Sequence, residues 1–307
     1  MRPPIRCKAA SAHEEGGFII VAVLWIVIAL STLVSIYAVY VVRSSYVVGA
    51  GDDRVNADAL FTAAVELTAY QLNSGAKEKR PVNGRFTFRM GRATVGLEFH
   101  TEGARIDLNA APKELLSSFF TVLGARPADA DDYADRIIAW RSTVDGDNAQ
   151  SDSEADAYRV AGKNYSPRRA PFQNTGELWL VLGLPPALVE RALPYLTVFN
   201  GRPQVNVLDA APLVLAALPG MGAQLNDFLQ ARDTAVDREA LLDALGPAKS
   251  SGTIEGGKAT RISVVVQFDS GRRVSAEIVV LVDDDAEQPY RVLSWRDDFD
   301  QLEPIVR

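Results

Sequence analysis

Acidic side chains crowd one segment in the middle of this chain, residues 145–156, which read DGDNAQSDSEAD. Carboxylates at this density repel one another unless water solvates them or a hard cation such as Ca²⁺ bridges them. The spacing does not match an EF-hand loop, because Ala149 stands where that loop has a ligand and Gln150 where it needs glycine. Two interpretations are therefore open: a solvated acidic loop, or a cation site with a different arrangement of ligands.

Histidine and cysteine, on which zinc sites and many catalytic sites depend, are scarce. The one cysteine is Cys7 and the two histidines are His13 and His100. Cys7 and His13 lie ahead of Gly16-Gly17, so a chain that loses this leader has no Cys/His zinc site and no Cys–His catalysis. A Ser-His-acid site would have to use His100, and the sequence has no GxSxG elbow. We expect no catalytic residues and interpret His100 as a surface residue at a strand end.

An uncharged run of 25 residues, Phe18 to Val42, follows the leader. As a helix it would be about 37 Å long, enough to cross a hydrocarbon core of about 30 Å. The small residues of an ordinary secretory signal follow its apolar region, whereas here Gly16-Gly17 precedes it. Cationic residues before the run and an acidic chain after it favour an N-in, C-out orientation, because Lys and Arg favour the cytoplasmic side.

This leader resembles the class III (type IV prepilin) signal of pilins and pseudopilins. The resemblance implies that a prepilin peptidase cuts after Gly17 and methylates Phe18, which becomes the first residue of the mature protein. An uncleaved signal anchor is the alternative.

The pattern after the apolar run predicts an α+β fold whose antiparallel sheet is interrupted. An amphipathic helix should end by residues 73–75, followed by a β-hairpin of residues 85–89 and 93–99. Strand signals then stop for about 155 residues and resume at 262–268, 274–282 and 290–295. We expect a large helical insertion between the two groups of strands.

The insertion contains an imperfect repeat: Ile106 to Pro112 reads IDLNAAP, and Val205 to Pro212 reads VNVLDAAP. We expect Asn109 or Asp209 to cap the helix that follows. In each copy a glycine-containing turn and a second helix come next, which is a helix-hairpin-helix pattern.

Helix-hairpin-helix repeats also occur in DNA-binding proteins, so a membrane-anchored DNA-uptake or DNA-binding protein is the alternative function. Charge argues against a nucleic-acid partner, because residues 203–246 hold two basic and six acidic side chains and the chain has a net charge of −7. An enzyme that uses carboxylates alone stays open by composition, but no paired-acid motif stands out.

Several segments in fixed order resemble protein K of the general secretion pathway, the large minor pseudopilin of type II secretion. They are the anchor, the LNAAP segment, the helix 134–141, the acidic segment, Pro171-Phe172, Glu177-Leu178 and 181–183. The resemblance implies a non-enzymatic minor pseudopilin at the tip of a periplasmic pseudopilus, which supports pseudopilus assembly and the export of folded proteins across the outer membrane.

The resemblance also implies sites, partners and a location. Ala22, the fifth mature residue, stands where most pseudopilins have glutamate, which suits a tip position without a neighbour above. Structural calcium is implied near the acidic segment, with ligands Asp145, Asp147, Glu154 and Asp156. Partners would be the I-type and J-type minor pseudopilins, the prepilin peptidase and the inner-membrane secretion platform. The protein would be a single-pass inner-membrane protein with its C-terminal domain in the periplasm.

We accordingly predict five regions along the chain. They are a leader (1–17), a transmembrane helix (18–42), a first pilin-like part (43–102), an inserted helical domain with two helix-hairpin-helix-like repeats (103–255) and closing strands (256–307).

Overall fold

The computed structural model describes residues 15–74, 80–143, 149–234, 238–282 and 288–298; within 15–19, 42–53 and 149–154 only the course of the backbone is described. The chain divides into two compact units, residues 1–59 and residues 60–307. Helix α1 (Glu15–Asn73) begins in the first unit and ends in the second.

The first unit holds the apolar part of α1. Ile20–Val41 spans 22 residues with a mean hydropathy of 2.5. None of the residues in its most apolar stretch is buried within the chain. By length and composition this segment can cross a membrane. Two of its hydroxyls are satisfied inside the helix, because Thr32 donates to the carbonyl of Ile28 (2.5 Å) and Ser35 to that of Ser31 (2.8 Å). The helix predicted over residues 18–42 is confirmed.

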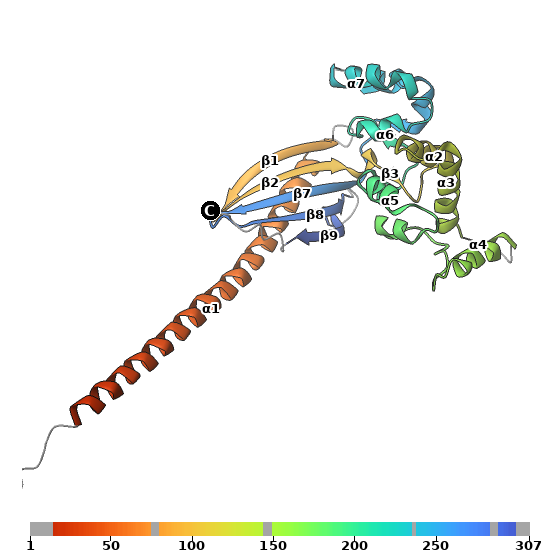
Figure 1. The fold of residues 1–307 in the computed structure, drawn as a ribbon. Coiled ribbons are helices and arrows are strands. Elements are labelled where there is room, and N and C mark those ends of the chain that lie inside the picture. The colour runs from red at the N-terminus through yellow and green to blue at the C-terminus, as the bar shows by residue number, and fades with distance from the viewer. Residues whose placement is uncertain (1–14, 75–79, 144–148, 235–237, 283–287, 299–307) are drawn as a thin grey trace, which may run out of the picture. The chain divides into compact units, whose positions relative to one another are not determined.

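The second unit contains a five-stranded antiparallel sheet of order β1-β2-β7-β8-β9 (Figure 1). Its neighbours β2 and β7 are separated in the chain by the whole insertion, yet they pair from Ala93↔Phe268 to Thr101↔Thr260. The predicted interruption of the sheet is therefore confirmed. The strands are β1 (Asn83–Met90), β2 (Ala93–Thr101), β7 (Ala259–Phe268), β8 (Arg273–Leu281) and β9 (Arg291–Asp298).

One face of this sheet is apolar because buried and partly exposed residues alternate along β2 and β7. The end of α1 within this unit contributes Phe61, Val65 and Leu72 to the core. The ring of Phe61 lies edge-on to that of Trp295 in β9, with centroids 6.4 Å apart. Helix α1 ends at Asn73, as the sequence predicts, and the side chain of Asn73 donates to the carbonyl of Pro289 (3.2 Å).

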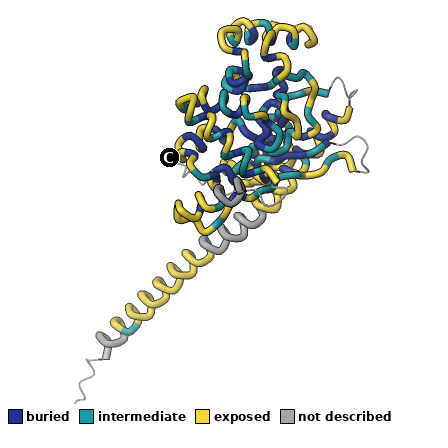
Figure 2. The backbone as a smooth tube through the Cα atoms, turned by 90° about the vertical axis from the view of Figure 1, so that its right-hand side faces the viewer, coloured by how far each residue is buried: buried dark blue, intermediate teal, exposed yellow. Residues whose placement is uncertain are grey.

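The insertion is mainly helical and has its own apolar core, to which α2 and α3 contribute Phe119, Phe120 and Ile137. Figure 2 shows that the buried backbone positions gather in the interior of the second unit, which includes the insertion. Its helices of at least five residues are α2 (Lys113–Val122), α3 (Pro127–Arg141), α4 (Ala149–Val160), α5 (Pro186–Ala192), α6 (Pro212–Ala216), α7 (Leu225–Thr234) and α8 (Arg238–Ala244), with 3₁₀ segments η3 (Thr175–Leu180) and η6 (Gly246–Ser251).

The insertion also contains short strands, which the sequence pattern did not predict. Strand β3 (Ile106–Asp107) pairs in parallel with β4 (Leu196–Thr197), and β5 (Val205–Asn206) pairs in parallel with β6 (Gly252–Thr253). Strands of two residues are too short to show an alternating pattern, so periodicity cannot detect them. Three further 3₁₀ turns in the described parts of the chain are η2 (Glu102–Ala104), η4 (Leu193–Tyr195) and η5 (Gly222–Gln224).

Candidate functional site

The two repeats of the insertion have the same local backbone geometry. In the first, a carboxylate oxygen of Asp107 accepts the N–H of Asn109 (2.7 Å); in the second, the side-chain oxygen of Asn206 accepts the N–H of Leu208 (3.0 Å). Both are Asx turns directly after a two-residue parallel strand. The equivalent residues are 99 positions apart (206 − 107 = 99), so Pro112 corresponds to Ala211 and not to Pro212.

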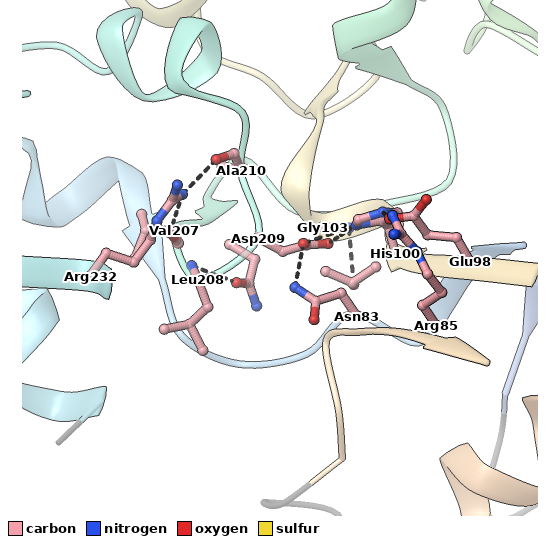
Figure 3. A network of polar contacts seen from close by, with 12 residues as sticks. Asn83, Arg85, Glu98, His100, Gly103, Val207, Leu208, Asp209, Ala210 and Arg232 are labelled. Atoms are coloured by element: carbon pink, nitrogen blue, oxygen red, sulfur yellow. Dashed lines mark hydrogen bonds and ion pairs between the residues drawn. The ribbon is translucent and has the colours of Figure 1, made fainter. Parts of the chain in front are cut away.

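An arginine near the end of the second helix closes each repeat in the same way. The guanidinium of Arg141 donates to the carbonyls of Leu108 and Ala111, the latter at 2.7 Å. That of Arg232 donates to the equivalent carbonyls of Val207 (3.4 Å) and Ala210 (2.7 Å; Figure 3). These arginines satisfy carbonyls at the turn before α2 and α6, a structural role that sequence reasoning did not find. The matching Arg at the end of both predicted helices was the available signal.

The capping role predicted for Asn109 and Asp209 is wrong. The N-cap residues of α2 and α6 are Pro112 and Ala211, and neither makes a side-chain capping hydrogen bond. Asn109 instead makes two hydrogen bonds with the backbone of Phe172, donating to its carbonyl (3.0 Å) and accepting its N–H (2.7 Å). Asp209 turns to the sheet, because a longer-range partner there outcompetes a local cap.

The signature segments of the insertion meet at a buried carboxylate, Glu177. Its oxygens accept hydrogen bonds from the indole N–H of Trp140 (3.3 Å), the backbone N–H of Gln173 (3.1 Å) and the guanidinium of Arg168 (3.3 Å). With three donors, including one cation, the buried charge is compensated.

Aromatic rings pack around the same point. The ring of Trp140 lies 6.1 Å from that of Phe172 and 6.2 Å from that of Tyr158. The hydroxyl of Tyr158 accepts the N–H of Leu182 (2.9 Å). Segments that the sequence shows only as an ordered series therefore form one structural core.

Where the insertion joins the sheet, charged side chains form a network (Figure 3). Both carboxylate oxygens of Asp209 lie 3.0 Å from Nδ1 of His100 in β2, and the side-chain amide of Asn83 in β1 donates to Asp209 (2.7 Å). On its other side, Nε2 of His100 lies 3.3 Å from a carboxylate oxygen of Glu98, which is paired with Arg85 (2.8 Å). The hydrogen bond to Asp209 raises the pKa of His100, although burial opposes the shift.

His100 lies near the end of β2, as predicted, but its side chain is only partly on the surface. Its side chain is 45% exposed, whereas that of its partner Asp209 is 4% exposed. The two residues are 109 positions apart. No local pattern connects them, so sequence reasoning missed the pair.

A second anchor at this junction is the fully buried Glu102 in η2. Its carboxylate accepts hydrogen bonds from Nε of Arg261 in β7 (2.6 Å), from another nitrogen of that guanidinium (3.1 Å), and from the hydroxyl of Thr197 in β4. Arg261 also pairs with Glu277 in β8. Glu102 thus links the sheet to the first repeat.

The predicted processing site and Ala22 all fall on α1. Gly17 and Phe18 belong to the stretch in which only the backbone is described. Ala22 is partly buried and lies within the exposed apolar segment. Cleavage after Gly17, methylation of Phe18 and the tip role of Ala22 remain predictions.

The predicted metal ligands are only partly described. Asp145 and Asp147 lie outside the described residues, and Glu154 has only its backbone described. Asp156 is exposed and forms an ion pair with Arg159 (2.6 Å). Among the described residues no group of three or more His, Cys, Asp or Glu could hold a metal ion.

The loop predicted over residues 145–156 is wrong for residues 149–156, because α4 begins at Ala149. Residues two positions apart on a helix do not face each other. In α4 the backbone positions 154 and 156 therefore do not share one face of the helix. Calcium in this segment stays a prediction.

One of the two basic residues on which DNA binding by the second repeat would depend is engaged within the protein. Of Arg232 and Arg238, the two cations of residues 203–246, Arg232 is bound to backbone carbonyls. Arg238 shares α8 with Glu239 and Asp243. The second repeat therefore does not offer a basic surface to phosphates.

Comparisons with known proteins agree with this architecture. Residues 99–201 match the family described as type II secretion system (T2SS), protein K. The fold is similar to that of a chain in the crystal structure of the GspK-GspI-GspJ complex from the enterotoxigenic Escherichia coli type 2 secretion system, with a TM-score of 0.57 and 15% identity over 80% of this chain and 98% of that chain. No curated protein matches the chain.

Proposed function

We propose that this chain is a minor pseudopilin of type II secretion and that it occupies the tip of a periplasmic pseudopilus; its protein K match and its fold support this. There it would support pseudopilus assembly and the export of folded proteins across the outer membrane. The observation that carries the proposal is the protein K match, which begins in β2 and covers the first repeat of the domain inserted between β2 and β7.

The apolar part of α1 would anchor the protein in the inner membrane as a single span. Its segment Ile20–Val41 is long enough, and the cations of the leader would keep the N-terminus on the cytoplasmic side. The second unit, residues 60–307, would then lie in the periplasm. Cleavage after Gly17 and methylation of Phe18 would prepare the helix for the pseudopilus.

Ala22 supports the tip position. A carboxylate inside a bilayer is costly unless a cation of a neighbouring subunit neutralises it. The terminal subunit has no neighbour above it, so an uncharged side chain at the fifth mature position avoids this cost.

The solved neighbour was crystallised as a complex of GspK, GspI and GspJ. We propose that this chain likewise assembles with I-type and J-type minor pseudopilins. The prepilin peptidase and the inner-membrane platform would be its partners during processing and assembly.

The role proposed is structural, not enzymatic, and calcium bound near residues 145–156 would be structural too. Asp145 and Asp147 would be its ligands together with acids of α4. Residues 154 and 156 are two positions apart in α4, so such a site would need only one of these two acids.

The test is to express the full chain with the prepilin peptidase and with I-type and J-type pseudopilins, purify it from membranes, and measure its intact mass and its partners. We expect a chain that begins at Phe18, carries one extra methyl group and co-purifies with both pseudopilins. A Gly17→Leu variant is the matched control and should keep its leader.

An uncleaved wild-type chain that still contains Cys7 and His13 would contradict the pseudopilin proposal. If that chain also bound duplex DNA with a salt-dependent affinity, the helix-hairpin-helix alternative would replace it.

A further inference from the structure

We propose that His100 and Asp209 form a pH-sensitive clamp between the sheet and the second repeat of the insertion, closed when His100 is protonated and loosened when it is neutral. The inference rests on the contacts at the junction and does not depend on the proposed function.

The position of Asp209 makes it a docking residue. It belongs to the second repeat, three residues before α6 begins, yet its hydrogen-bond partners His100 and Asn83 both lie on the sheet. Its side chain is 4% exposed. A carboxylate this far from water depends on the donors that the sheet offers.

The repeat itself does not require this acid. With the constant offset of 99 residues, the position equivalent to Asp209 in the first repeat is Ala110 (209 − 99 = 110). Both repeats keep the same Asx turn and the same arginine closure. Asp209 is therefore not needed for the local fold of the repeat, and its contacts join the second repeat to the sheet.

The geometry around His100 calls for an imidazolium. Nδ1 faces Asp209 at 3.0 Å and Nε2 faces Glu98 at 3.3 Å, so both ring nitrogens point at carboxylates. A neutral imidazole has one N–H and one lone pair, and its lone pair would then face a negative oxygen. Only the protonated ring donates to both partners.

Charged groups on neighbouring strands determine which charges His100 faces. Arg85 in β1 holds Glu98, and its hydrogen bond lowers the pKa of Glu98, so this carboxylate is ionised near neutral pH. Arg261 in β7 is the register partner of His100, but its guanidinium is bonded to Glu102 and Glu277.

Arg105 is a further cation close enough to interact with Asp209. The direction of the pKa of His100, raised by Asp209 against burial, agrees with the geometry.

The clamp would loosen the junction without releasing it. The Glu102–Arg261 pair at the second anchor consists of groups whose ordinary pKa values lie far from neutral. Raising the pH therefore weakens the contact of His100 with Asp209 and leaves the hydrogen bond from Asn83 to Asp209 and the contact at η2 in place.

The experiment follows the ring signals of His100 by NMR in the full chain in micelles, where they are assigned by their loss in the His100→Gln variant, since His13 is the other histidine of the sequence. In parallel, hydrogen exchange of the amides of residues 205–211 is measured between pH 5.5 and 8 and corrected for intrinsic rates. We expect a pKa above 6.5. We also expect protection of these amides to fall through that pKa, by about tenfold for each unit of the measured shift.

His100→Gln should remove the pH dependence of protection, and Asp209→Asn should lower the pKa of His100 while the fold is kept. Lys249→Gln breaks an exposed ion pair with Asp243 and is the control, which should behave as wild type. A pKa of His100 at or below 6.5, or the same protection profile in wild type and His100→Gln, would overturn the proposal.

Discussion

Replacing Glu102 by alanine should destabilise the second unit much more than the loss of an exposed ion pair would. The side chain of Glu102 is 0% exposed and that of Arg261 is 12% exposed, and two hydrogen bonds of 2.6 and 3.1 Å join them. Removing one partner of a buried pair leaves a charge without compensation, which costs about 3–5 kcal/mol. Arg261 keeps Glu277, whose side chain is 39% exposed, so we expect the lower end, about 3 kcal/mol.

The assay is unfolding of the full chain in micelles, followed by tryptophan fluorescence, because Trp140 lies in the insertion and Trp295 in β9. For a unit of this size, each kcal/mol shifts the melting temperature by about 2–4 °C, so Glu102→Ala should lower it by about 6–12 °C. Arg202→Ala is the control, since it breaks the Arg202–Glu255 pair, whose side chains are 43% and 72% exposed; it should cost at most about 1 kcal/mol.

A third variant separates the buried charge from the lost packing. Replacing Glu102 and Arg261 together by methionine removes both charges, and this exchange is often neutral for buried pairs. The double variant should therefore recover much of the stability lost in Glu102→Ala. If Glu102→Ala cost no more than Arg202→Ala, the argument that this pair anchors the insertion would be refuted.

Three further predictions follow from other contacts. Arg141→Ala and Arg232→Ala should cost similar amounts, about 1.5–3 kcal/mol each in chemical unfolding, because each removes a charged donor from equivalent carbonyls; a large difference would contradict the equivalence of the repeats. The stability that the His100–Asp209 pair adds should be complete below the ordinary histidine pKa of 6.5 and lost as the pH rises through the raised folded-state pKa, so the melting temperatures of wild type and His100→Gln should converge with rising pH. If residues 145–156 bind calcium, EDTA should lower the melting temperature of wild type but not of an Asp145→Ala, Asp147→Ala variant, and an unchanged wild-type value would count against calcium.

The sequence predicted those parts of the fold that have long periodic patterns. The apolar helix, the hairpin of β1 and β2, and the return of strands at β7 follow from runs of five to 25 residues, which the structure extends to strands of eight to ten residues. Two-residue strands such as β3 show no period. The helical start of α4 was missed because acidic and small residues were interpreted as a loop, although Ala149 and its neighbours tolerate a helix.

The site was harder to predict because its contacts join distant residues. Asn109 and Asp209 have the side chains of good N-caps, and tertiary partners outcompeted that local preference. The Trp140–Glu177 bond spans 37 positions, and the segments on either side of it showed only their order in the sequence. Charge counting, by contrast, needs no long-range contact, because the two basic and six acidic residues of 203–246 are counted in the sequence itself.

The pairing of β2 with β7 has a consequence for the order of folding. Thr101 and Thr260 lie side by side across the centre of the sheet, although 158 residues separate them (260 − 101 − 1 = 158). Closing a flexible loop of that length costs about 4–5 kcal/mol of chain entropy. A compact insertion whose own ends already meet at η2 would make the closure short, so we expect this region to fold first and to act as a template for the central strand pair. Pulse-labelled hydrogen exchange during refolding should then protect amides of α2 and α3 before those of β7, and simultaneous protection would argue for a single cooperative step.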